Sequence, residues 1–244
     1  MGSLRPLLLA AAASIAAVTL PIGAAVAGSF NVSPVRVEMS AADRTQALTV
    51  RNEGGEPSVV QVQILAWSQD SGQDILQPTT DLLVSPPVFT VQPGQSQLVR
   101  IALRSTPDPA RQLSYRAILQ EVPGPSRADG PSLQVALKIS LPIFVEPAVE
   151  TAPQLDWKAQ VNPDGKLLLS AHNSGNGHIQ LADFKLSAAG GAELVSQQQV
   201  SYILPGQTRT WTLQPNAELT PVGSVQLAGR SDAGDLATEI EVTR

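Results

Sequence analysis

The chain of 244 residues contains no cysteine. Disulfides, cysteine-ligated metals and thiol chemistry are therefore excluded as sources of stability or activity. Domains without these aids have to rely on their hydrophobic cores, which sandwiches of about 100 residues can do. Positive charge is also scarce, with 16 Lys and Arg against 21 Asp and Glu and no basic tract. Since nucleic-acid binding depends on clustered positive charge, we expect no nucleic-acid partner.

The first 27 residues have the three parts of a secretory signal peptide. Arg5 provides a positive start, residues 7–18 are apolar except for Ser14, and Ala25 to Ala27 form a small-x-small cleavage site. We expect cleavage after Ala27. A retained membrane anchor is less favoured, because the apolar stretch is short for a membrane span. The mature chain would have a charge of −6, from 15 basic residues (16 minus Arg5) and 21 acidic ones.

Short alternating runs of Val, Leu, Ile and Thr fill the rest of the chain, and Pro, Gly, Asn and Asp interrupt them. This spacing is typical of β-sandwiches, and no stretch shows a sustained helical period. We therefore predict an all-β protein with very little helix. In the first half, strands are expected at 30–39, 46–51, 58–67, 83–90, 95–104, 113–122 and 133–145. In the second half, they are expected at 155–161, 166–173, 179–188, 193–202, 208–213, 224–230 and 236–242.

Residues 146–153 separate the two β regions. They have a proline near each end and no alternation, as is typical of a linker. The seven strands expected before them are an immunoglobulin-like number. The sequence thus predicts a signal peptide at 1–27 and two immunoglobulin-like sandwich domains at 28–147 and 148–244.

No catalytic motif stands out. The chain has no G-x-S-x-G, H-E-x-x-H or phosphate-binding loop, so we expect neither enzymatic activity nor a cofactor. His172 and His178 lie in AHNSGNGHIQ without accompanying carboxylates, and we interpret them as turn and strand-end residues and not as metal ligands. Trp67, Trp157 and Trp211 lie in expected strands, where core packing is favoured over a sugar-binding platform.

The stretch LQVALKISLPIFVEP, at 133–147, carries the clearest functional signal. Its apolar residues alternate with more polar ones: Leu133, Val135, Leu137, Ile139 and Leu141. Pro142 then interrupts the strand, and proline belongs at a sheet edge or a bulge because it cannot donate to the ladder. An apolar edge strand is usually avoided, since it invites pairing with another chain. Either this strand is covered within its own domain or pairing with another chain is its function.

Several segments occur in an order and spacing that resemble the periplasmic pilus-assembly chaperones of the chaperone–usher pathway. They are FNVSPVRVEMS, ALTVRNEGGEP, VQVQILAWSQ, LLVSPPVFTVQPGQSQLVRIAL, LSYRAILQEVP and LQVALKISLPIFVEP. The resemblance is strong over 30–147. It is weaker over 155–244, where YILPG followed by RTW is similar to the archaic or spore-coat-U-type branch. The short connection at 123–131 and the missing cysteines resemble the short-loop members.

The resemblance implies a boomerang of two immunoglobulin-like domains that binds pilin-like subunits lacking a strand and delivers them to an outer-membrane usher. By donor-strand complementation, the last strand of the first domain would fill the gap in the subunit. The matching residues here are Leu133, Val135, Leu137, Ile139 and Leu141. Whether the free protein self-associates to cover this strand is left open by the sequence.

The family also anchors the C-terminal carboxylate of the subunit with two basic residues. Arg36 in SPVRVEM matches the first, and a guanidinium suits a carboxylate because it donates two parallel hydrogen bonds. The second is a lysine whose position falls at or near Pro142, so this chain departs from the pattern. Arg100, Arg116 and Lys138 are the substitute candidates.

Two other classes of protein remain as alternatives. A self-polymerising structural or adhesive sandwich would need a missing strand of its own and a free donor tail. A carbohydrate-binding module or accessory enzyme module would need exposed tryptophans, and only the scattered Trp residues support it.

Overall fold

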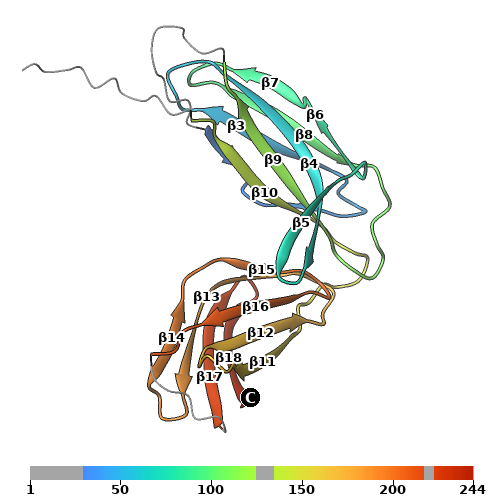
Figure 1. Ribbon diagram of the computed structural model, residues 1–244. Helices are drawn as coiled ribbons and strands as arrows, with labels where there is room; N and C mark the ends of the chain where they lie inside the picture. Colours follow the sequence, from blue (N-terminus) through green and yellow to red (C-terminus); the bar gives the residue numbers. More distant parts are fainter. Residues whose placement is uncertain (1–29, 125–134, 217–222, 244) are drawn as a thin grey trace, which may run out of the picture.

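The computed structural model describes residues 30–124, 135–216 and 223–243. The signal peptide, its cleavage site, Leu133 and most of the 123–131 connection lie outside the described residues. Every regular element within them is a β-strand, and none of them forms a helix that could span a membrane. The strands build two immunoglobulin-like sandwich domains that meet at an angle, like a boomerang (Figure 1).

The first domain packs a four-stranded sheet on a six-stranded one. The four-stranded sheet has the order β1-β3-β8-β6, and the other has the order β2-β10-β9-β4-β5 with β7 beside β4. Alternate residues of both sheets point inward and form one core around Leu48, Val99, Ile101 and Ile143. The strands are β1 (Phe30–Ser33), β2 (Val37–Met39), β3 (Thr45–Asn52), β4 (Ser58–Asp70), β5 (Gln73–Pro78), β6 (Leu82–Ser85), β7 (Val88–Val91), β8 (Ser96–Leu103), β9 (Leu113–Val122) and β10 (Lys138–Val145).

The second domain has its own core, centred on Leu167, Leu169, Leu186 and Leu227. Its strands follow the order β14-β13-β17-β18-β11-β12-β16, with β15 beside β13. Trp157 and Trp211 stack in this core, with ring centroids 6.0 Å apart, as the sequence predicted for them. The strands are β11 (Leu155–Val161), β12 (Leu167–Asn173), β13 (Ile179–Ala188), β14 (Glu193–Gln197), β15 (Ser201–Ile203), β16 (Thr208–Leu213), β17 (Gly223–Ser231) and β18 (Gly234–Thr243).

Several predicted strands are wrong in extent. The strands expected at 30–39 and 83–90 are each two strands, because the chain crosses from the four-stranded to the six-stranded sheet at a proline that cannot serve a ladder. The strand expected at 193–202 is likewise two, β14 and β15. β5 was not expected, since its residues are mostly polar and exposed, and pairing with β4 is what holds it. The strand expected from 133 is regular only from Lys138 among its described residues.

A small aromatic cluster joins the two domains. Trp67 and Phe144 come from the first domain, and Tyr202 and Leu204 come from the second. The β4–β5 hairpin reaches across to this point (Figure 1), where the buried Gln69 donates to the carbonyl of Tyr202 and accepts from the backbone N–H of Leu204. Trp67 therefore packs as predicted, but between the domains and not inside one sandwich.

Candidate functional site: the open edge of strand β10 and the interdomain cleft

Strand β10 has one fully paired edge and one that is half open. All eight residues of β10 pair with β9 in antiparallel register, whereas only Ile143 to Val145 pair with β2 on the other side. Among the described residues, no strand pairs with Lys138 to Leu141 on that second edge. Unpaired backbone groups at a sheet edge are a template for another chain.

The register shows which backbone groups face the open edge. The N–H of Glu121 donates to the carbonyl of Leu137 at 2.9 Å, so this opposed pair is a hydrogen-bonded one. Such pairs alternate with non-hydrogen-bonded pairs along an antiparallel ladder. The even-numbered residues Lys138, Ser140 and Pro142 therefore direct their backbone groups toward the open edge. Because the backbone of Pro142 faces the open edge, its missing N–H removes no hydrogen bond to β9. On the open edge, Pro142 ends the series of backbone N–H groups that could donate to another strand.

Of the predicted donor residues, Ile139 and Leu141 lie on the inward face of β10, and Val135 and Leu137 lie in the described segment just before the strand. Leu141 is 6% exposed and belongs to the first domain's core, and Ile139 packs partly against that core. Leu137 is half-buried, and Val135 is 57% exposed. The apolar row thus begins outside the sandwich and ends inside it, so its earlier members are the ones open to a partner.

Arg36 lies just before β2 and bridges from the first domain to the second. Its Nη2 donates to Asp232 Oδ2 at 2.6 Å and to Gln180 Oε1 at 2.9 Å, both in the second domain. Its Nη1 is 3.9 Å from Glu38 Oε1, and the guanidinium lies 5.6 Å from the centre of the Phe144 ring. Burial by itself would lower the pKa of Arg36, but the hydrogen bond and charge of Asp232 raise it above its ordinary value.

Arg116, in β9, reaches the aromatic cluster between the domains. It is the cross-strand partner of Pro142 in a non-hydrogen-bonded pair, in which side chains lie closest. Its guanidinium lies 3.6 Å from the centre of the Trp67 ring and 5.2 Å from that of Tyr202. Burial lowers the pKa of Arg116, which remains a cation at physiological pH.

The other two candidate cations are placed apart from Arg36. Lys138 is exposed at the start of β10, four residues or about 13 Å along the strand from Pro142. Arg100 is exposed on the outer face of β8, in the four-stranded sheet that does not contain β10. The structure therefore brings Arg36 and Arg116 together around the aromatic cluster and leaves Lys138 and Arg100 outside it.

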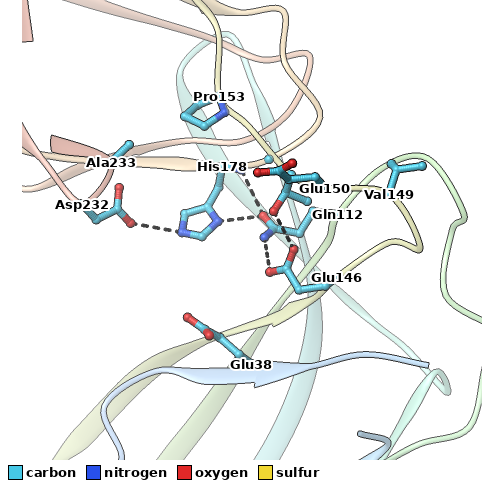
Figure 2. Close-up of a pocket in the computed structure, with 11 residues that line it drawn as sticks. Glu38, Gln112, Glu146, Val149, Glu150, Pro153, His178, Asp232 and Ala233 are labelled. Carbon is cyan, nitrogen blue, oxygen red and sulfur yellow. Dashed lines mark hydrogen bonds and ion pairs between the residues drawn. The ribbon is translucent and has the colours of Figure 1, made fainter. Parts of the chain in front are cut away.

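Four further residues shape the cleft but were not singled out as site residues by the sequence: Gln112, His178, Tyr202 and Asp232. Figure 2 shows the His178 ring between Asp232 and Gln112, at the wall of a cleft of about 480 Å³ that Glu38, Glu146 and Glu150 also line. His178 Nδ1 is 2.7 Å from Gln112 Oε1, and its Nε2 is 3.4 Å from Asp232 Oδ2. His178 directly precedes β13, in agreement with the predicted strand-end position. Among the described residues, no three His, Cys, Asp or Glu side chains are grouped so that they could hold a metal ion.

Asp232 is the electrostatic centre of this cleft. Partial burial alone would raise its pKa. The contact with His178, the backbone N–H of Gln180 and the guanidinium of Arg36 together hold the pKa of Asp232 well below its usual range. The carboxylate is therefore ionised wherever the protein is folded near neutral pH, and it neutralises much of the charge of Arg36.

The fold and site define a two-domain, immunoglobulin-like protein with a half-open strand edge in its first domain and two arginines near the aromatic cluster between its domains. Residues 29–150 match the family of pili and flagellar-assembly chaperones, PapD N-terminal domain, and the chain belongs to that family. No curated protein matches the sequence significantly.

Solved structures of pilus chaperones have the same fold. The crystal structure of the E. coli chaperone DraB is 25% identical, with a TM-score of 0.58 over 88% of this chain and 96% of that one. The CsuC–CsuE chaperone–tip adhesion subunit pre-assembly complex, from the archaic chaperone–usher Csu pili of Acinetobacter baumannii, contains a chain that is 20% identical. Its TM-score is 0.66, over 88% of this chain and 98% of that one. The Salmonella enterica SafA pilin–SafB chaperone complex contains a chain that is 18% identical, with a TM-score of 0.60 over 88% and 96%.

Proposed function

We propose that this protein binds pilin-like subunits in the periplasm by donor-strand complementation and hands them to an outer-membrane usher. The observation that carries the proposal is the half-open edge of β10, with free backbone groups and an inward apolar row beside it. A subunit that lacks a strand would add its own edge there and receive the apolar side chains. The short connection and the absent cysteines support the short-loop kind of chaperone, and YILPG followed by RTW supports the archaic branch.

The apolar row divides into two parts under this proposal. Val135 and Leu137 are exposed enough to enter a groove of the subunit, with Ile139 at the boundary. Leu133, outside the described residues, remains a proposed donor from the sequence alternation. Leu141 is already buried in its own domain, so its main contribution is to hold β10 in place. Fully burying an aliphatic side chain is worth about 1.5 to 3 kcal/mol, so three or four donors offset much of the cost of association.

We propose Arg36 and Arg116 as the pair that holds the terminal carboxylate of the subunit. Both guanidiniums lie near Tyr202, and Arg116 stands beside Pro142, where the family pattern has a lysine. The existing pair with Asp232 means that an incoming carboxylate competes for Arg36. Arg116 has no carboxylate within ion-pair distance among the described residues and offers the less neutralised charge.

The deciding experiment is a subunit-capture assay with Leu137→Glu. The charged side chain should block capture of a co-expressed pilin-like subunit, while the free protein keeps its melting temperature because Leu137 is only half-buried. The matched control is Ser140→Glu, which puts the same charge on the opposite, exposed face of β10. Unchanged capture by Leu137→Glu, with Ser140→Glu as active as the wild type, would show that β10 is not the donor strand.

A further inference from the structure

One nitrogen of Arg36 is fully occupied within the free protein. Its Nη2 donates to Asp232 Oδ2 at 2.6 Å and to Gln180 Oε1 at 2.9 Å. A terminal nitrogen of a guanidinium carries two hydrogens, so two acceptors use both of them. Both acceptors belong to the second domain, whereas Arg36 lies just before β2 of the first domain.

This occupancy closes both edges on which Arg36 could hold a carboxylate through two parallel hydrogen bonds. One edge of a guanidinium is formed by Nε and Nη2, and the other is formed by Nη1 and Nη2. Each edge therefore requires one hydrogen of Nη2. Because Asp232 and Gln180 take these hydrogens, no incoming carboxylate can bind Arg36 in the bidentate manner unless one of them leaves.

The remaining hydrogens of Arg36 are a poorer alternative. Nη1 lies 3.9 Å from Glu38 Oε1, so a carboxylate that bound there would stand beside another anion. A single bond from Nε would leave Asp232 on the same guanidinium, and two carboxylates would then share one positive charge. Like charges at such distances repel each other. The strong position on Arg36 is therefore the one that Asp232 occupies.

Asp232 can release Arg36 without losing its own place in the turn between β17 and β18. Its Oδ1 accepts the backbone N–H of Gln180 at 2.8 Å, and its own N–H donates to the carbonyl of Gln180 at 3.0 Å. Neither bond involves Arg36. The Arg36 side chain is also 28% exposed, so another carboxylate can reach it from solvent. An exchange of partners at Arg36 thus leaves the second domain intact.

We propose that Asp232 is an internal competitor for the carboxylate anchor, which occupies Arg36 in the free protein and is displaced by the terminal carboxylate of a subunit. The inference rests on the proposed function and deepens it, because it assigns regulation of the anchor to the second domain. Each contact that the subunit gains at Arg36 is offset by one that Asp232 loses. The subunit is therefore held less firmly than an unoccupied Arg36 would hold it. When the subunit leaves, Asp232 takes Arg36 again.

Asp232→Asn tests the competition in a subunit-affinity assay. The amide keeps the size of the side chain and an oxygen for the N–H of Gln180, but it carries no charge for Arg36. We expect subunit affinity to rise about tenfold, although the free protein loses stability. A residue with only a structural role would lower both. Asp183→Asn is the matched control, because Asp183 pairs with Arg230 on the surface of the second domain, and it should leave the affinity unchanged.

Two results of this assay would overturn the inference. One is an affinity of Asp232→Asn that equals that of the wild type or lies below it. The other is a gain of the same size in the Arg36→Gln background, where Asp232 has no anchor to compete for. Either result leaves the proposed function standing as long as Leu137→Glu still blocks capture, so the two failures can be told apart.

A second measurement uses the free protein and does not depend on strand addition. N-acetylglycine serves as a small probe with the terminal carboxylate of a peptide, and N-acetylglycinamide is the uncharged control. Nuclear magnetic resonance of the backbone N–H groups next to Arg36 follows the binding. We expect Asp232→Asn to bind N-acetylglycine about tenfold more tightly than the wild type, and Arg36→Gln and the amide probe to show no such gain. If Asp232→Asn binds the acid no more tightly than the wild type, the inference is wrong.

Discussion

Arg116 and Pro142 are cross-strand neighbours in β9 and β10, and Arg116 extends from there to the aromatic cluster between the domains. A basic side chain from the adjacent strand therefore stands beside Pro142, at or near which the resemblance implies the second basic anchor. The guanidinium lies over the Trp67 ring, which stabilises the cation without neutralising its charge.

This relationship predicts that Arg36→Gln and Arg116→Gln each weaken subunit capture. Losing charge-assisted hydrogen bonds costs about 1.5 to 3 kcal/mol, or roughly a tenfold to hundredfold loss of affinity. The measurement is subunit affinity in parallel with the melting temperature of the free protein. Arg100→Gln is the matched control, because Arg100 is exposed on the opposite sheet. If Arg116→Gln binds the subunit with full affinity but has a lowered melting temperature, Arg116 only packs in the aromatic cluster and does not anchor the subunit.

The burial gradient along β10 predicts opposite outcomes for two truncations. Leu141→Ala removes a core side chain and should lower the stability of the free protein by about 2 to 5 kcal/mol. Val135→Ala removes an exposed one and should change stability by less than about 0.5 kcal/mol while weakening subunit binding. Chemical denaturation of both variants, followed by capture assays, tests this. Equal destabilisation by the two changes would contradict the gradient.

The β4–β5 hairpin should stabilise the contact between the two domains through Gln69. This side chain is 6% exposed and serves the carbonyl of Tyr202, the N–H of Leu204 and the carboxylate of Asp74. Gln69→Ala leaves backbone groups of the second domain without partners, at a cost of about 1 to 3 kcal/mol. Ser68→Ala, on the exposed neighbouring residue, is the control. The measurement is the denaturation midpoint of each variant. Equal midpoints for Gln69→Ala and Ser68→Ala would show that Gln69 does not stabilise the contact between the domains.

The lowered pKa of Asp232 predicts a pH-dependent effect of Asp232→Asn. A carboxylate whose pKa is lower in the folded than in the unfolded state stabilises the fold above its unfolded value, near 4, and loses that effect as the pH falls. The stability gap between wild type and variant should therefore be largest above about pH 5 and shrink below about pH 4. Denaturation curves across this range provide the test, and a gap that stays constant with pH would contradict the assignment.

The strands were predictable where one face is buried. The bounds of β9, β11, β13 and β16 agree with the alternation, because each has an apolar inner face and a polar outer one. β5 could not be predicted from its own residues, because it is a strand through its pairing with β4. The strand breaks at 34–36 and 86–87 could not be predicted, because they occur where the chain passes from one sheet to the other.

The site was predictable only in part. Arg36 and the apolar row could be found from local motifs. The partners of Arg36 could not, because Gln180 and Asp232 lie 144 and 196 residues further along the chain. His178 and Gln112 are 66 residues apart, and no local pattern marks them as partners. The closeness of Arg116 to Pro142 depends on strand register, which becomes evident only once β9 and β10 are paired.

The position of Pro142 also limits how long an added strand can be. Only two regular residues of β10, Lys138 and Ser140, offer an N–H on the open side before the proline, and beyond it β2 occupies the edge. Within β10, a guest chain can therefore form only a short backbone ladder, and side chains would have to supply the rest of its hold. Under the proposed function, a subunit held by so few backbone hydrogen bonds could be released stepwise, one contact after another.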